Sequence, residues 1–204
     1  NHDVVLGHDY ISSLVSFSKE HPHSLVGSMV VSKTSRSRVW FFGGGYNQKT
    51  GSNQHTMGQV TDFVEPSKTT WLTGMGVLVP TSVFSEVGYY DEKNFPLYFG
   101  DADFSERARR SGYTLWVNPR SIVYGDVENN WVGKNVRRPK IGFIVDIFRL
   151  TNSPYQWKSR RLYYKLYWPG NYRLALFKFY VIESRGLYSA YLKGLAKRVL
   201  KRSN

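Results

Sequence analysis

The sequence predicts an α/β domain that is followed by a basic, helical extension. Apolar runs of strand length alternate with helix-like segments over residues 1–130, and this alternation is typical of the α/β class. The charge changes at the same place. Residues 1–130 hold 11 Lys and Arg against 13 Asp and Glu, whereas residues 131–204 hold 17 against 2. We therefore divide the chain into a charge-balanced domain, 1–130, and a basic extension, 131–204.

The first half of the domain contains one predicted helix and two predicted strands. Asp9 is a candidate cap for a helix that ends before Pro22, because its apolar residues recur at helical spacing. Residues 24–32 and 38–42 are rich in β-branched and aromatic side chains, which predicts two strands. Residues 43–56 hold mostly Gly, Asn, Gln, Ser and Thr, so we expect a long loop there, and such loops are often functional.

The second half continues the alternation. We expect a loop leading into a strand over 71–79, and then a short helix over 82–87 that ends at Gly88. A second helix over 104–111 ends at Gly112. Strands over 113–117 and 121–124 follow, on either side of an Asn118-Pro119 turn. No internal repeat interrupts this order.

Two carboxylates lie where the 104–111 helix begins. In a structural interpretation, Asp103 caps the helix and Asp101 is a solvated loop residue. In a chemical interpretation, one of these carboxylates serves as a general base. The segments around Asp101 and Asp103 favour the chemical interpretation.

Those segments resemble a known family. They are Trp71-Leu72-Thr73-Gly74, the stretch Val83 to Glu92, Phe95 to Asp103, Arg107 to Tyr113, Val117-Asn118-Pro119 and Val123-Tyr124. In this order and spacing they resemble the acceptor-side half of family 2 glycosyltransferases, of the rhamnosyltransferase-like type. The resemblance is dense from Trp71 to Tyr124 and weaker before Gly27.

The resemblance implies a GT-A fold, in which a nucleotide-sugar donor meets a glycan, polysaccharide or lipid-linked acceptor at the end of a central sheet. It implies sugar transfer with inversion, with Asp101 as the catalytic base. Asp103 would orient the site or contact the acceptor. Gly74 and Trp71 would belong to the acceptor loop, where Trp71 is either a platform for a sugar ring or a core residue. His55 is a further candidate for substrate contact.

The resemblance also implies a divalent metal. Asn1-His2-Asp3 with Val4-Val5 is similar to the family's DXD motif, so Asp3 is the predicted ligand of Mg²⁺ or Mn²⁺. The family's nucleotide-binding strands precede this motif, and we therefore expect this chain alone to bind nucleotide-sugar poorly. Gly100 and Gly125 replace the usual glutamate and histidine, although Asp126 is an alternative ligand. These departures leave open a catalytically silent domain that binds membrane or glycan.

The basic extension predicts a contact with an anionic membrane surface through residues 155–202. Leu187, Tyr191, Leu195 and Val199 recur at helical spacing, and Lys193 and its i+4 repeats lie on another face. A basic amphipathic helix with nearby aromatics suits a lipid surface. The alternative is a packed helix with a solvated basic face.

Nucleic acid is not an expected partner, because no recognisable nucleic-acid motif accompanies the basic residues. The chain has no cysteine, which fits a reducing compartment. With the family's common acceptors, this predicts a cytoplasmic protein, peripheral at the inner face of the cell membrane, that takes part in polysaccharide biosynthesis for the cell envelope.

Overall fold

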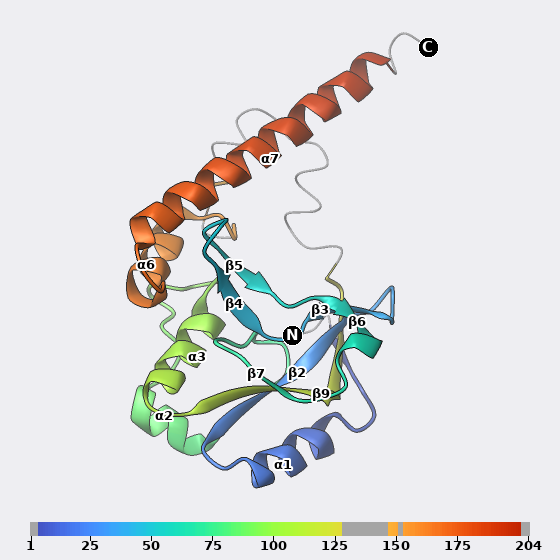
Figure 1. Ribbon diagram of the computed structural model, residues 1–204, viewed down its shortest axis with the longest axis vertical. Coiled ribbons are helices and arrows are strands. Elements are labelled where there is room, and N and C mark those ends of the chain that lie inside the picture. The colour runs from blue at the N-terminus through green and yellow to red at the C-terminus, as the bar shows by residue number, and fades with distance from the viewer. Residues whose placement is uncertain (1–3, 128–146, 151–152, 201–204) are drawn as a thin grey trace. The chain divides into compact units, whose positions relative to one another are not determined.

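The computed structural model describes residues 4–127, 147–150 and 153–200, which form two compact units (Figure 1). The first unit holds residues 4–45, 53–93 and 99–127. The second unit holds residues 46–52 and 94–98 together with the described residues after 127. Two short stretches of the first 130 residues thus belong with the C-terminal helices.

A mixed sheet forms the centre of the first unit. Its longest strands, β2 (Ser24–Ser32) and β9 (Thr114–Gly125), are parallel neighbours. The strand order is β1-β9-β2-β3-β6, with β7 paired to β9 and β8 paired to β2. The shorter strands are β1 (Val4–Leu6), β3 (Arg38–Phe41), β6 (Gly58–Gln59), β7 (Ser67–Lys68) and β8 (Val77–Leu78), with a 3₁₀ turn, η1 (Val60–Asp62), after β6. The predicted α/β class is confirmed at this level.

The predicted turn at Asn118-Pro119 is wrong, because β9 passes through it as one strand. Ser28 of β2 pairs with Asn118, and the next β2 residue, Met29, pairs with Ile122. Residues 119–121 therefore bulge out of the ladder, which accommodates the missing N–H of Pro119. A hydrogen bond of 2.8 Å between the hydroxyls of Ser28 and Ser121 closes the bulge.

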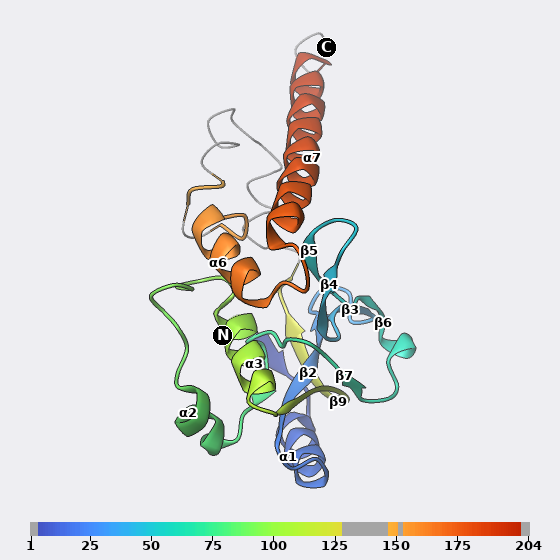
Figure 2. The same cartoon turned by 60° about the vertical axis from the view of Figure 1, so that its left-hand side comes forward.

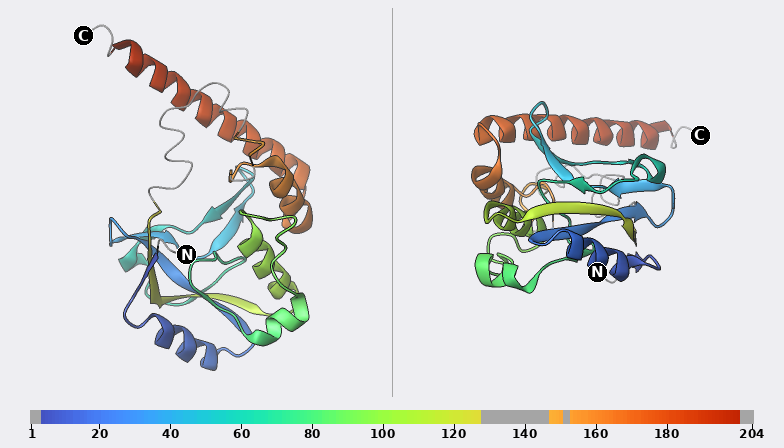
Figure 3. Two further views of the ribbon diagram at one scale, coloured as in Figure 1. Left: turned by 180° about the vertical axis from the view of Figure 1, so that it is seen from behind. Right: turned by 60° about the horizontal axis from the view of Figure 1, so that its bottom comes forward.

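Helix α1 (Tyr10–Glu20) covers one face of the sheet (Figure 3). Leu14 and Phe17, one turn apart, are buried with Val26 of β2. This helix has the predicted bounds, and Asp9 is its N-cap residue. The Asp9 side chain makes no capping hydrogen bond, and instead lies 2.9 Å from the ring of His8.

The other face is covered by the segment that leads into β8 and by helix α3 (Gly100–Arg110), which Figure 2 shows on the far side of β2 from α1. A side chain at Gly27 of β2 would collide with Leu72 at 2.6 Å, so the strand and this segment are in direct contact. Helix α2 (Thr81–Val87) precedes α3. As predicted, it ends at a glycine with positive φ, Gly88 at 76°.

The predicted loop over 43–56 is instead a β-hairpin of β4 (Gly44–Asn47) and β5 (Ser52–His55). Its backbone groups are paired although its side chains are polar. Hydrogen bonds between Phe42 and Thr56 and between Thr56 and Gly43 continue the pairing at its base. The segment has no apolar alternation, which is why the sequence predicts a loop. Its strands form nevertheless, because the pairing of a hairpin depends on backbone hydrogen bonds as well as on buried side chains.

The second unit is built on helices α6 (Trp157–Tyr167) and α7 (Tyr172–Leu200). Its core is aromatic, and the fully buried rings of Tyr163 and Tyr164 form the centre. The Tyr164 hydroxyl donates to the carbonyl of Gly51 at 2.8 Å. The predicted basic amphipathic helix that begins at Leu187 overlaps the C-terminal part of α7, where Leu187 is buried. None of the helices in the described ranges is long and apolar enough to cross a bilayer.

Candidate active site

Asp101 lies in the first turn of α3, and its carboxylate is held by backbone donors. The N–H of Gly74 donates to Oδ2 at 2.8 Å, and the N–H of Ala102 donates to Oδ1 at 2.9 Å. The side chain of Thr73 makes a further hydrogen bond to the carboxylate. Phe99, the N-cap of α3, has a φ of 71°, a left-handed conformation that turns the chain into the helix.

Burial raises the pKa of the Asp101 carboxyl above its ordinary value. The hydrogen bonds from Gly74, Ala102 and Thr73 oppose this effect, because they stabilise the ionised form. The effect of burial on the pKa exceeds that of the hydrogen bonds, so the pKa of Asp101 is raised overall. A carboxylate with a raised pKa is a better proton acceptor near neutral pH than a solvated aspartate.

Ser105 of α3 forms a hydrogen bond with the loop that precedes Gly74. The Leu72 N–H donates to the Ser105 hydroxyl at 3.1 Å, and that hydroxyl donates to the Asp101 carbonyl at 2.6 Å. Ser105 is buried. A Cβ at Gly74 would lie 3.7 Å from the Cβ of Asp101, an ordinary contact. The contribution of Gly74 to the site is therefore its N–H.

The same loop connects Asp101 with the carboxyl end of the parallel strands. A Cβ at Gly125, the last residue of β9, would lie 3.5 Å from the sulfur of Met75. The backbone N–H of Ser28, in the middle of β2, donates to the carbonyl of Gly76 at 2.8 Å and ties the same loop to the sheet. Ligand sites of open α/β sheets lie at the carboxyl ends of the strands. Asp101 is thus fixed by a loop that contacts this end of the sheet.

The side chain of Asp103 has different partners from that of Asp101, although the two residues are only two apart in the sequence. It is 2% exposed, and its Oδ2 pairs with the Nε of Arg107 at 3.0 Å. Arg107 also donates to the carbonyls of Val87 and of Tyr89, the latter at 2.8 Å. Asp103 therefore helps to attach α3 to the turn after α2, and the N-cap residue of α3 is Phe99.

Trp71 occupies a core position. Its side chain is 5% exposed, and its ring lies 5.3 Å from the ring of Phe41 and 5.3 Å from that of His55. A side chain at Gly44, which forms a β-bridge with Trp71, would overlap the indole ring. The indole Nε1 is buried and has no hydrogen-bond partner. Of the two interpretations for Trp71, the structure supports the core residue.

His55, at the end of β5, meets three aromatic rings. Its ring lies edge-on to Trp40 at 4.4 Å, to Phe41 at 5.4 Å and to Trp71 at 5.3 Å. Burial lowers the pKa of His55 to about 4, so the imidazole is neutral at physiological pH.

The predicted metal ligand Asp3 lies outside the described residues. Asp126 follows the end of β9 and is exposed. No group of three or more Asp, Glu or His side chains within the described ranges has the geometry of a metal site. Of the two predicted ligands, only Asp126 therefore has a described position.

Sequence reasoning missed Tyr90 as a site residue. Its ring stacks on Phe104 of α3 at 4.6 Å, yet the side chain is 44% exposed. Burial of the hydroxyl raises its pKa, and the charge of nearby Asp101 raises it further. Tyr90 is thus an accessible aromatic beside the carboxylate. Tyr90 belongs to the Val83–Glu92 segment of the resemblance, but the spacing of residues there does not distinguish Tyr90 from its neighbour Tyr89.

The fold and the site together define an α/β protein with a mixed sheet and a partly buried carboxylate next to an accessible tyrosine. No protein-family model and no curated protein sequence matches the chain.

Proposed function

We propose that this chain supplies the acceptor side of an inverting, GT-A-type glycosyltransferase, with Asp101 as the general base. One observation carries the proposal. The Asp101 carboxylate is fixed by the N–H groups of Gly74 and Ala102, and burial nevertheless raises its pKa. A fixed carboxylate with a raised pKa meets the two requirements of a general base, which are geometry and proton affinity.

In the proposed reaction, an acceptor hydroxyl attacks the anomeric carbon of a nucleotide-sugar. A new C–O bond forms as the bond to the diphosphate breaks, and the diphosphate leaves with the electron pair. Asp101 takes the hydroxyl proton. The carboxylate need accept this proton only as the hydroxyl becomes acidic in the transition state.

Tyr90 is the proposed contact for the acceptor. Its exposed ring, supported from behind by Phe104, offers a flat apolar surface within the electrostatic influence of Asp101, and aromatic rings combine such a surface with a polar edge. A glycan or lipid-linked sugar has the matching apolar face. A bound Mg²⁺ or Mn²⁺ would neutralise the leaving diphosphate, and Asp3 and Asp126 remain its proposed ligands.

A second candidate is a catalytically silent domain that binds glycan or membrane. One observation favours it: both oxygens of Asp101 already accept backbone hydrogen bonds, an arrangement that also serves to hold a loop. Gly100 and Gly125, which depart from the family pattern, agree with this candidate.

The test measures release of nucleoside diphosphate from a panel of UDP-, GDP- and dTDP-sugars by the complete product of the gene. Short oligosaccharides and lipid-linked sugars are offered as acceptors. Transfer that is lost in Asp101→Asn supports the proposal. Glycan binding that is equal in both proteins, without transfer in either, supports the silent domain.

A further inference from the structure

A groove of about 760 Å³ runs between α6 and α7 in the second unit. Trp157 and Arg161, one turn apart on α6, line one wall. The residues of α7 that line the other wall recur at helical spacing along one face; they are Tyr172, Arg173, Leu176, Phe177, Tyr180, Val181, Ser184 and Arg185. A volume of this size accommodates a small ligand or a segment of a larger one.

The groove presents apolar side chains to solvent. Trp157 is 48% exposed and Phe177 is 67% exposed. Between them the floor is formed by Leu176, which is buried, and by Tyr180, whose ring lies 5.1 Å from that of Trp157. Exposed apolar surface in a concave site indicates contact with an apolar group.

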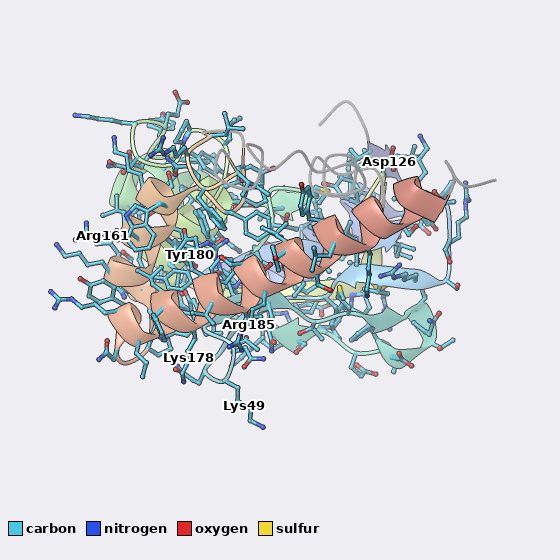
Figure 4. All side chains as sticks on the ribbon, turned by 90° about the horizontal axis from the view of Figure 1, so that it is seen from above. Lys49, Asp126, Arg161, Lys178, Tyr180 and Arg185 are labelled. Carbon is cyan, nitrogen blue, oxygen red and sulfur yellow. The ribbon has the colours of Figure 1, made fainter. Side chains whose placement is uncertain are left out.

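Positive charge lies along the same groove. Figure 4 shows Arg161 on α6 and Arg185 on α7, and Arg173 is the third cation of the lining. None of the described residues that line the groove is acidic. An anion in the groove would therefore meet no opposing carboxylate of the lining. Arg173 and Arg185 are twelve residues apart on α7, about 18 Å along the helix, so a single anion would meet the arginines of one end.

Cations of both helices converge at the Tyr172 end. The pKa of the Tyr172 hydroxyl is lowered by a hydrogen bond with Arg173 and by the charges of Arg173, Arg161 and Lys165. This end of the groove therefore has a positive potential to which α6 and α7 both contribute. A phosphate group is the kind of anion that arginine binds well.

We propose that this groove binds an anionic phospholipid, with the phosphate at Arg161 and Arg173 near the Tyr172 end and the first acyl carbons over Trp157 and Phe177. The occupant must be both anionic and apolar, since the arginines and the exposed apolar side chains share one groove. A free phosphate would use only the arginines. Single-stranded nucleic acid would also find four rings in the lining, but the aliphatic Leu176 and Val181 beside them favour an acyl chain. The inference is independent of the proposed transfer reaction, because it depends on the second unit alone.

The test is co-sedimentation of the protein with liposomes. One set contains phosphatidylcholine only, and the other contains equal parts of phosphatidylcholine and phosphatidylglycerol. Binding is expected to the second set and to be at least tenfold weaker to the first. Soluble dihexanoyl phosphatidylglycerol is then added as a competitor, with inorganic phosphate and a single-stranded RNA oligonucleotide in parallel.

Two charge-matched variants separate the groove from general electrostatic attraction. The groove variant is Arg161→Gln/Arg173→Gln/Arg185→Gln. The control is Arg149→Gln/Lys158→Gln/Lys193→Gln, which removes three exposed cations of the same unit that do not line the groove. The groove variant is expected to weaken binding at least tenfold more than the control, because each contacted cation contributes beyond the surface field. Phe177→Ser tests the acyl contact, and circular dichroism checks the folding of every variant.

Each outcome decides the proposal. Selective loss in the groove variant, loss in Phe177→Ser and competition by the short-chain lipid support it. Equal losses in the two triple variants would show that no defined groove is used. Competition by inorganic phosphate as strong as that by the lipid would overturn the acyl contact. Displacement of the lipid by RNA at lower concentration would identify a nucleic-acid site instead.

Discussion

The Oδ2 atom of Asp101 accepts a hydrogen bond of 2.8 Å from the backbone N–H of Gly74, 27 residues earlier in the chain. This bond joins the first turn of α3 to the loop that leads into β8. Because the donor is a backbone group, this bond does not depend on the rotamer of another side chain. The two elements therefore set the direction of the proposed general base.

Replacing the proposed base should greatly decrease transfer but keep the fold. Asp101→Asn retains one carbonyl oxygen for the Gly74 N–H, loses the bond from the Ala102 N–H and removes the proton acceptor. We expect a decrease in kcat of about 10²–10⁴-fold, the usual contribution of a general base. The measurement is nucleoside diphosphate release with a competent acceptor. Asp9→Asn, at an exposed carboxylate on the same unit, is the control and should leave kcat unchanged.

The Asp103–Arg107 pair should affect stability more than turnover. Asp103 is 3% exposed at its side chain and Arg107 is 25% exposed, so Asp103→Asn leaves a largely buried guanidinium without its counter-charge. We expect a loss of about 3 kcal/mol in the free energy of unfolding, near the lower end for a broken buried pair. Urea denaturation measures it, with Lys19→Gln on α1 as the exposed control. A stable variant with greatly decreased kcat would instead indicate that Asp103 contacts substrate.

Two substitutions at Trp71 should have very different effects. Trp71→Phe keeps a ring against Phe41 and removes the unpartnered Nε1 donor, so we expect a change within about 1 kcal/mol. Trp71→Ala leaves a cavity and should cost about 3–5 kcal/mol. Thermal unfolding of both variants checks this. If both retain wild-type stability but lose acceptor binding, the ring is a sugar platform after all.

His55 should make stability depend on pH between about 6.5 and 4. Its pKa falls from 6.5 to about 4 on folding, so the unfolded chain binds this proton more tightly. Stability is then complete above the unfolded pKa and is lost as the pH decreases through this window, by up to about 3 kcal/mol. Denaturation midpoints at several pH values measure the effect. His55→Phe should flatten the profile, whereas the exposed His8, changed to Asn, should not.

Elements with local signals could be predicted from the sequence. The helix after Asp9 and the helix that ends at Gly88 have their caps and stop signals within a few residues, and both were found. The β4–β5 hairpin was missed because its polar side chains carry no periodic pattern. Pro119 suggested a turn, but the bulge opposite Ser28 accommodates it within β9.

The site could be predicted only in part. Asp101 was identified through the order of the surrounding segments, and it remains the proposed base. The ion pair of Asp103 with Arg107 could not be predicted from the sequence. It depends on a tertiary contact, in which Arg107 also binds the carbonyl of Val87 in the turn after α2. Tyr90 could not be recognised from the sequence, because its position depends on the tertiary stacking of its ring on Phe104 of α3.

The hairpin tip over residues 46–52 has a consequence for biosynthesis. The carbonyl of Gly51 pairs with Tyr164, 113 residues later, and that of Gln48 pairs with Lys178, 130 residues later. At a translation rate of about 5–20 residues per second, the tip is synthesised roughly 6–26 s before these partners. During that interval its carbonyls can be satisfied only by water or by a chaperone. The second unit can therefore be completed only after Lys178 has emerged from the ribosome.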